Sequence, residues 1–121
     1  MSKKILVVDD EEDIASVLLV RLGTHGYDTA SASTGSQALE LVKHDKFDLI
    51  ILDILMPDMN GTEVAQILRD DPKTKDIPII FLTALGTQQE GPGYSISGSS
   101  ILFAKPYDPI ELMTKIDELL N

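Results

Sequence analysis

The sequence predicts an α/β domain in which helices cover both faces of a parallel sheet. Five short runs of apolar and often β-branched residues alternate with segments in which apolar residues recur at helical spacing. Runs that are apolar at nearly every position are typical of strands buried on both faces, as they are in a parallel sheet. The chain has 121 residues, enough for one such doubly wound domain and too few for two. We therefore expect a single domain over residues 1–121.

The first half of the chain predicts two strand–helix units. The first strand covers residues 4–8, and a helix over 13–22 follows it. Gly23 and Gly26 are expected to end that helix, because glycine readily adopts the left-handed conformation found just after helices. A weaker strand at 27–31 leads into a second helix, which begins with the capping box Thr34-Gly-Ser-Gln37.

The second half continues the alternation. The most apolar strand is expected at 47–52, and the capping box Asn60-Gly-Thr-Glu63 begins the helix after it. Further strands are expected at 77–82 and 101–104. The last helix begins at Asp108-Pro-Ile-Glu111, where the aspartate is the cap and proline occupies the first helical position.

One segment interrupts this alternation. Residues 86–100 contain four glycines, four serines and a proline. The connection between two parallel strands normally contains a helix. Inside a helix, however, glycine costs about 1 kcal/mol and proline about 3 kcal/mol relative to alanine. We expect a fourth helix that is short, disordered or absent. A flexible surface loop is a simpler interpretation than a mobile element that responds to a ligand.

The composition excludes several classes of function. The chain carries 20 acidic and 10 basic side chains, a net charge of −10, and it has no cysteine. This charge repels phosphate backbones and anionic lipids, so we expect no direct binding to nucleic acid or membranes. The lack of cysteine excludes disulfides, thiolate metal sites and thiol nucleophiles. No apolar run approaches the roughly 18 residues of a membrane helix, and we expect a cytoplasmic protein.

Polar side chains follow four of the five predicted strands. Asp9 and Asp10 follow the first strand, Asp53 the third, Thr83 the fourth and Lys105 the fifth. In a parallel sheet the carboxyl ends of the strands share one edge, where ligands bind. We therefore expect these five residues to converge, although each alone has a simpler explanation, such as an acidic run that stabilises a helix N-terminus.

Such a group of side chains suits phosphoryl chemistry. Three carboxylates in one crevice repel one another and need a proton or a cation, and an oxygen-only site favours Mg²⁺. A lysine and a hydroxyl beside the metal can donate hydrogen bonds to phosphoryl oxygens. An aspartate in that setting can act as a nucleophile and become an aspartyl phosphate.

The same residues carry a resemblance to a known family. The chain resembles the response-regulator receiver domain of two-component signal transduction over essentially all of its 121 residues. Any one of the matching motifs is weak, but all four in this order are specific. The motifs are Ile5-Leu-Val-Val-Asp9-Asp10-Glu11, Asp53-Ile-Leu-Met56-Pro57-Asp-Met59-Asn60-Gly61, Phe81-Leu-Thr83-Ala84 and Lys105-Pro106-Tyr107-Asp108.

The resemblance implies a fold, a metal and a role for each site residue. The fold would be flavodoxin-like, with a five-stranded parallel sheet in the order 2-1-3-4-5. Asp53 would accept a phosphoryl group from the phosphohistidine of a kinase. Asp10, Asp53 and the backbone carbonyl of Leu55 would bind Mg²⁺ directly, and Asp9 would act through a metal-bound water. Thr83 and Lys105 would bond the phosphoryl oxygens.

The resemblance also implies the partners. A sensor histidine kinase or phosphotransfer protein would supply the phosphoryl group, and a downstream protein or output domain would respond to it. The kinase would contact the first helix and the loop after the fifth strand, here Ile14, Val17 or Leu18 with Pro106 and Tyr107. The protein would be a switch that catalyses only its own phosphorylation and dephosphorylation, with no output module on these 121 residues.

Two features depart from the family pattern, namely Leu102 and the glycine- and serine-rich segment 86–100 in place of a fourth helix. Receivers usually carry a Tyr or Phe three residues before the lysine, where this chain has Leu102. Phe103 cannot replace that aromatic residue, because adjacent strand residues point to opposite faces of the sheet.

Leu55 and Leu85 flank the expected site, and neither can orient a hydrolytic water by hydrogen bonding. We therefore expect slow autodephosphorylation.

Three other functions remain open at this stage. A flavodoxin-like protein that binds FMN shares the fold, but the acidic run after the first strand would repel the FMN phosphate. A phosphatase with an aspartate nucleophile shares the chemistry, but its nucleophile follows the first strand. A receiver-like interaction module that signals without phosphorylation is the most serious alternative, given Leu102 and the unusual segment 86–100.

Overall fold

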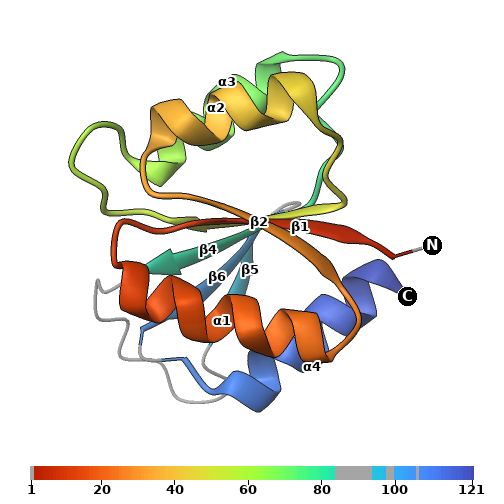
Figure 1. Cartoon of the computed structure of the whole chain (residues 1–121). Coiled ribbons are helices and arrows are strands. Elements are labelled where there is room, and N and C mark those ends of the chain that lie inside the picture. The colour runs from red at the N-terminus through yellow and green to blue at the C-terminus, as the bar shows by residue number, and fades with distance from the viewer. Residues whose placement is uncertain (1, 84–93, 98–99, 106) are drawn as a thin grey trace.

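The computed structural model describes residues 2–83, 94–97, 100–105 and 107–121. These residues form one six-stranded sheet in the order β2-β1-β3-β4-β6-β5, with helices on both sides (Figure 1). The strands are β1 (Lys4–Val8), β2 (Asp28–Ala32), β3 (Leu49–Asp53), β4 (Ile79–Thr83), β5 (Tyr94–Ser97) and β6 (Ser100–Ala104). The described helices are α1 (Glu12–Thr24), α2 (Gly35–His44), α3 (Gly61–Asp70) and α4 (Pro109–Leu120).

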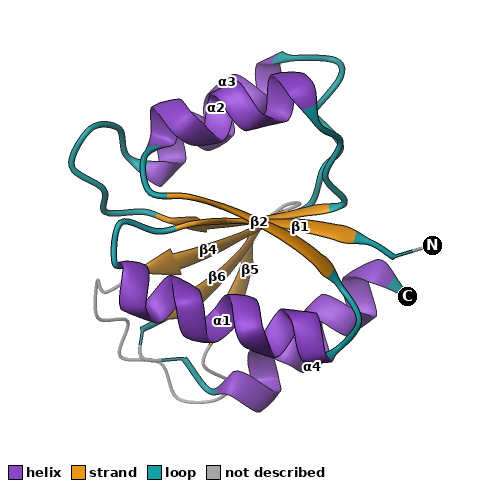
Figure 2. Ribbon diagram, in the orientation of Figure 1, coloured by secondary structure: helices purple, strands orange, loops and turns teal. Residues whose placement is uncertain are grey.

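Five of the strands are parallel and confirm the predicted fold. β2, β1, β3, β4 and β6 pair in that order, which is the expected order 2-1-3-4-5 with β6 as the fifth parallel strand. Helices α1 and α4 cover one face of the sheet, and α2 and α3 cover the other (Figure 2). This is the doubly wound arrangement, in which the carboxyl ends of the parallel strands share one edge.

The sixth strand, β5, was not predicted. It runs antiparallel to β6 at the edge of the sheet, with Tyr94 opposite Phe103 and Ile96 opposite Ile101. In the sequence, Tyr94 and Ile96 alternate with serines, and such alternation favours a strand over a helix. The expected absence of a helix therefore holds at residues 94–97. The rest of the glycine- and serine-rich segment, residues 86–93 and 98–99, lies outside the described residues.

Alternate residues of each central strand enter two separate cores. In β1, Ile5 and Val7 lie in the core beneath α1 and α4, whereas Leu6 and Val8 lie in the core beneath α2 and α3. The same alternation separates the last strand's Phe103, which is fully buried in the first core, from Leu102, which is half-buried. Phe103 therefore does not occupy the position where the family usually has an aromatic residue.

Two of the three predicted helix caps form. Thr34 accepts a hydrogen bond from the backbone N–H of Gln37 and caps α2, and Asp108 accepts from Ile110 and caps α4. The capping box predicted at Asn60 is wrong, because the Asn60 side chain makes no cap hydrogen bond. The first helical residue of α3, Gly61, instead donates its backbone N–H to the carbonyl of Ile54 at 2.9 Å.

Candidate functional site

Three carboxylates meet at the carboxyl edge of the sheet. Asp9 follows β1, Asp10 is next along the chain, and Asp53 is the last residue of the neighbouring strand β3. One ligand oxygen of each lies within 4.8 Å of the others. Asp9 and Asp53 are buried, whereas Asp10 is exposed. A cluster of oxygen ligands that opens to solvent on one side fits Mg²⁺, which usually keeps several of its waters.

Lys105 closes the site from the end of β6. Its ammonium donates to Oδ2 of Asp9 at 3.0 Å, Oδ2 of Asp53 at 3.1 Å and Oε1 of Glu11 at 3.1 Å. The convergence of Asp9, Asp53 and Lys105 from strands far apart in the sequence is as expected. Glu11 was not predicted as a site residue. It is one of five consecutive acids, and nothing in that run distinguishes it from the others.

Two further predicted residues lie beside this cluster. Thr83 is the buried last residue of β4, and its backbone carbonyl accepts a hydrogen bond from the backbone N–H of Lys105 at 2.7 Å. Leu55 lies two residues beyond Asp53, and its backbone N–H is 3.3 Å from Oδ1 of that carboxylate. The Thr83 hydroxyl as a phosphoryl donor and the Leu55 carbonyl as a metal ligand stay predictions. Ala84, Leu85 and Pro106 lie outside the described residues.

The charges of the site change its titration behaviour. The pKa of Asp53 is raised from 3.8 to about 6, mainly by burial. The Lys105 ammonium lowers this pKa, and the Asp9 carboxylate raises it further. For Lys105, burial lowers the pKa, but the hydrogen bonds and charges of Asp9, Glu11 and Asp53 outweigh burial and raise it. Lys105 therefore stays charged, while Asp53 is a carboxylate that is protonated more readily than usual.

This shift predicts a pH dependence of stability in metal-free buffer. A carboxyl group with a raised pKa in the folded protein favours folding below its unfolded pKa, and the contribution is lost as pH rises through the folded value. Between pH 4 and pH 7 in EDTA, we expect the free energy of unfolding of wild type to fall by about 2 kcal/mol relative to Asp53→Asn. Urea denaturation across this range measures the difference. Parallel curves for the two proteins would contradict the shift.

The backbone of Asp53 is held by a glycine. A Cβ on Gly61 would lie 2.3 Å from the Asp53 carbonyl oxygen and 3.0 Å from Cα of Ile54. The start of α3 therefore packs directly against the strand end that presents the Asp53 side chain. Asp58, in the loop between them, accepts hydrogen bonds from the backbone N–H groups of Gly35 and Ser36 and so joins this loop to α2.

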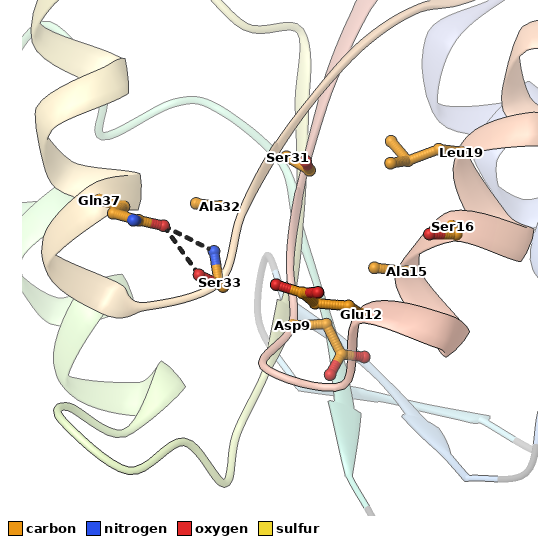
Figure 3. Close-up of a pocket in the computed structure, with 9 residues that line it drawn as sticks. All are labelled: Asp9, Glu12, Ala15, Ser16, Leu19, Ser31, Ala32, Ser33 and Gln37. Atoms are coloured by element: carbon orange, nitrogen blue, oxygen red, sulfur yellow. Dashed lines mark hydrogen bonds between the residues drawn. The ribbon is translucent and has the colours of Figure 1, made fainter.

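A cavity of about 250 Å³ lies next to the carboxylate cluster, on the β2 side. Figure 3 shows Asp9 and Glu12 near its base, with Ser33 and Gln37 across from them. The Gln37 side-chain oxygen accepts from the backbone N–H and the hydroxyl of Ser33 at 2.9 and 3.0 Å. Asp9 belongs to both the carboxylate cluster and the lining of this cavity, whereas Asp53 and Lys105 do not line it.

The outer surface of α1 differs in part from the expectation. Val17 and Val20 are exposed, so this helix presents apolar side chains to solvent. Leu18, named in the sequence analysis as a contact residue, is buried in the core and cannot contact a partner. Tyr107 is half-buried against the same core. None of the helices among the described residues is long and apolar enough to cross a membrane.

Comparisons with known proteins agree with this geometry. A family model described as the response regulator receiver domain matches residues 5–117. A probable transcriptional regulator, ycf27 of Cyanophora paradoxa, is 42% identical over 119 residues, which are 98% of this chain and 48% of that protein. The chain thus spans about half the length of this curated relative.

Solved structures of one response regulator are similar over nearly the whole chain. The response regulator TrrA of Thermotoga maritima in complex with Mg²⁺ and BeF is 36% identical, with a TM-score of 0.79 and coverage of 97% of this chain and 98% of that one. TrrA in complex with the histidine kinase ThkA is also 36% identical, with a TM-score of 0.80 and coverage of 98% and 99%.

Proposed function

This chain belongs to the response regulator receiver domain family, and on that premise we propose that it accepts a phosphoryl group on Asp53 in a Mg²⁺-dependent reaction. The observation that carries the proposal is the position of Asp53, a buried carboxylate that pairs with the Lys105 ammonium and lies beside the carboxylates of Asp9 and Asp10. Residues 1–121 would form one receiver domain, within which the family model matches residues 5–117.

The reaction uses Asp53 as the nucleophile. One of its carboxylate oxygens attacks the phosphorus of a phosphohistidine, the new O–P bond forms as the N–P bond breaks, and the imidazole leaves with the electron pair. With a pKa of about 6, Asp53 is mostly ionised at pH 7 and can attack. Lys105 is already 3.1 Å from Oδ2 of Asp53, where it can pair with an oxygen of the transferred group.

The carboxylate cluster would hold the metal that this reaction needs. Asp10, Asp53 and the Leu55 carbonyl would bind Mg²⁺ directly, and Asp9 would bind through water. Bound Mg²⁺ neutralises charge that develops on the phosphoryl oxygens. Asp9 contributes further as a buried partner of Lys105, which it holds beside Asp53.

The partners follow from the relatives and the surface. TrrA forms a complex with a histidine kinase, and we propose that a histidine kinase or phosphotransfer protein contacts the apolar α1 surface around Val17 and Val20. The net charge of −10 argues against nucleic-acid binding by the receiver itself. Any DNA binding would reside in an additional domain, which fits relatives about twice as long. The protein would act in the cytoplasm as a switch that catalyses only its own phosphorylation and dephosphorylation.

Mass spectrometry of the intact protein tests the proposed reaction. After incubation with acetyl phosphate and Mg²⁺, we expect one added phosphoryl group, and no addition when EDTA replaces Mg²⁺. Equal addition in EDTA would contradict the metal dependence. No addition in Mg²⁺ from acetyl phosphate or from a panel of phosphorylated kinases would favour a module that signals without phosphorylation.

The side chain of Leu55 predicts slow loss of the phosphoryl group. This side chain is 47% exposed beside Asp53 and has no polar atom to orient an attacking water. Replacing Leu55 with asparagine adds one hydrogen bond to that water, and one such bond corresponds to roughly a tenfold faster hydrolysis. The half-life of phosphorylated protein in Mg²⁺ is the measurement. Leu55→Ala is the control, and equal acceleration in both variants would show that water access limits hydrolysis.

A further inference from the structure

The loop between β3 and α3 is fixed by backbone hydrogen bonds at its two ends. The backbone N–H of Ile54 donates to the carbonyl of Leu82 at 2.9 Å, and the carbonyl of Ile54 accepts from Gly61 at 2.9 Å. Between these ends, residues 55–59 exchange no hydrogen bond with any other backbone group of the described chain. Segments with few such bonds open locally at low cost unless side chains hold them. The proposed metal ligand, the carbonyl of Leu55, belongs to this stretch.

Side chains hold the middle of this loop. Met56 is buried, and Met59 partly buried, in the core beneath α2 and α3. Asp58 reaches the first turn of α2, where its Oδ1 accepts from the backbone N–H of Gly35 at 3.1 Å. Its Oδ2 accepts from the backbone N–H and the hydroxyl of Ser36 at 3.2 and 3.0 Å. Because N–H groups in the first turn of a helix have no acceptor within that helix, this carboxylate supplies what α2 itself lacks.

Close packing brings the first turn of α2 within reach of this carboxylate. A Cβ on Gly35 would lie 2.9 Å from Cγ2 of Val64 and 3.0 Å from Cβ of Met59, so the start of α2 lies directly against the loop and α3. Partial loss of solvent around Asp58 acts to raise its pKa, but the hydrogen bonds from Gly35 and Ser36 outweigh this effect and lower the pKa. The contact therefore favours the ionised carboxylate, which is the stronger acceptor.

We propose that Asp58 is a positioning residue for the metal site. By binding the first turn of α2, it holds the loop in the conformation in which the Leu55 carbonyl can serve as a ligand beside Asp53. Without this contact the loop samples other conformations, and the apparent affinity for Mg²⁺ falls in proportion to the fraction of molecules that remain competent to bind. This inference rests on the proposed function of the carboxylate cluster as a Mg²⁺ site.

Three variants separate positioning from the effect of net charge. Asp58→Ala and Asp58→Asn remove the same charge, but asparagine keeps one side-chain oxygen that can accept from α2. The matched control is Glu63→Ala, which removes an exposed acid from the first turn of α3. Among the described residues, the carboxylate of Glu63 makes no hydrogen bond or ion pair. Thermal unfolding of each variant checks that the fold is intact.

Hydrogen exchange in EDTA, followed residue by residue, examines the contact itself without metal or phosphoryl group. The amides of Gly35 and Ser36 and those of residues 55–59 should exchange faster in Asp58→Ala than in wild type or Glu63→Ala. Equal exchange in all three proteins would show that Asp58 does not hold the loop, and would overturn the proposal.

Calorimetric titration with Mg²⁺ measures the consequence for the metal site. We expect Asp58→Ala to bind Mg²⁺ about threefold to tenfold more weakly than wild type, the range that corresponds to the loss of one hydrogen bond. Asp58→Asn should lie between the two, and Glu63→Ala should differ from wild type by less than about twofold at 0.15 M salt. Equal affinities of wild type and Asp58→Ala, or equal weakening by Asp58→Ala and Glu63→Ala, would overturn the proposal.

The Mg²⁺ dependence of phosphorylation by acetyl phosphate separates this inference from the proposed function. In Asp58→Ala the half-saturating Mg²⁺ concentration should rise by the same factor as the dissociation constant, and the loss of rate should disappear at saturating Mg²⁺. A rate that stays low at saturating Mg²⁺ would indicate a general structural defect and contradict positioning of the metal ligand. If wild type binds Mg²⁺ in a manner that depends on Asp58 but accepts no phosphoryl group, phosphorylation of Asp53 fails and the role of Asp58 stands. If wild type binds no Mg²⁺, both fail.

Discussion

Replacing Lys105 with methionine is expected to lower the free energy of unfolding at pH 7 in EDTA by about 3 kcal/mol, the cost typical of breaking a buried ion pair. The ammonium lies between the buried carboxylates of Asp9 and Asp53, and methionine keeps most of the side-chain volume but no charge. Without the cation these carboxylates repel each other in a poorly solvated site. Urea denaturation of both proteins measures the loss.

Two conditions identify the cause of that loss. The deficit should shrink in saturating Mg²⁺, because a divalent cation can take over the neutralisation, and it should shrink at pH 5, where a carboxylate can take up a proton. The control Lys43→Met removes an exposed pair with Glu40 and should change stability by less than about 0.5 kcal/mol. A Lys105→Met deficit that is unchanged by Mg²⁺ would show that packing, and not charge, is responsible.

Replacing Gly61 with alanine is the second change expected to have a large effect. The added Cβ would lie 2.3 Å from the Asp53 carbonyl oxygen, so α3 or the end of β3 must move. We expect a loss of about 2 to 3 kcal/mol, as for other overpacked buried sites, measured by urea denaturation. Because the displaced backbone carries the phosphoryl acceptor, phosphorylation by acetyl phosphate should also slow.

Gly23 provides the matched control for this substitution. The predicted helix end at Gly23 is wrong, because α1 continues through this residue to Thr24 and Gly26 is the glycine with a positive φ of 90°. A Cβ on Gly23 has no neighbour within 4 Å. Gly23→Ala should therefore stabilise the protein by about 0.5 to 1 kcal/mol, because alanine favours the helix more than glycine does. If Gly61→Ala were also neutral or stabilising, the close contact between α3 and the Asp53 backbone would not be a constraint.

The parallel sheet and most of the site were predictable from local sequence. Apart from the more polar β2, each parallel strand is a short apolar run, and Asp9, Asp53 and Lys105 each stand at a strand end, so the topology alone brings them to one edge. The strand at residues 94–97 was missed because the glycines and serines of the surrounding segment 86–100 indicate a loop, whereas pairing with the apolar β6 decides the outcome.

Other features depend on contacts that the sequence does not specify. Leu18 and Val17 are adjacent apolar residues of one helix, and only the rotation of α1 against the sheet buries the first and exposes the second. Glu11 contacts Lys105 across 94 residues of sequence, and its neighbours in the acidic run are chemically equivalent candidates. The Asn60 side chain makes no cap hydrogen bond, and Gly61 lies close to the strand backbone, neither of which a local pattern encodes.

Localising the modification tests most directly whether Asp53 receives the phosphoryl group. Protein treated with acetyl phosphate and Mg²⁺ is reduced with borohydride, which marks an acyl phosphate, and is then digested and sequenced by mass spectrometry. We expect the mark at residue 53 in wild type and in the control Asp58→Asn, and no mark at any residue in Asp53→Asn. A mark on another acidic residue, or an unchanged yield from Asp53→Asn, would contradict the assignment.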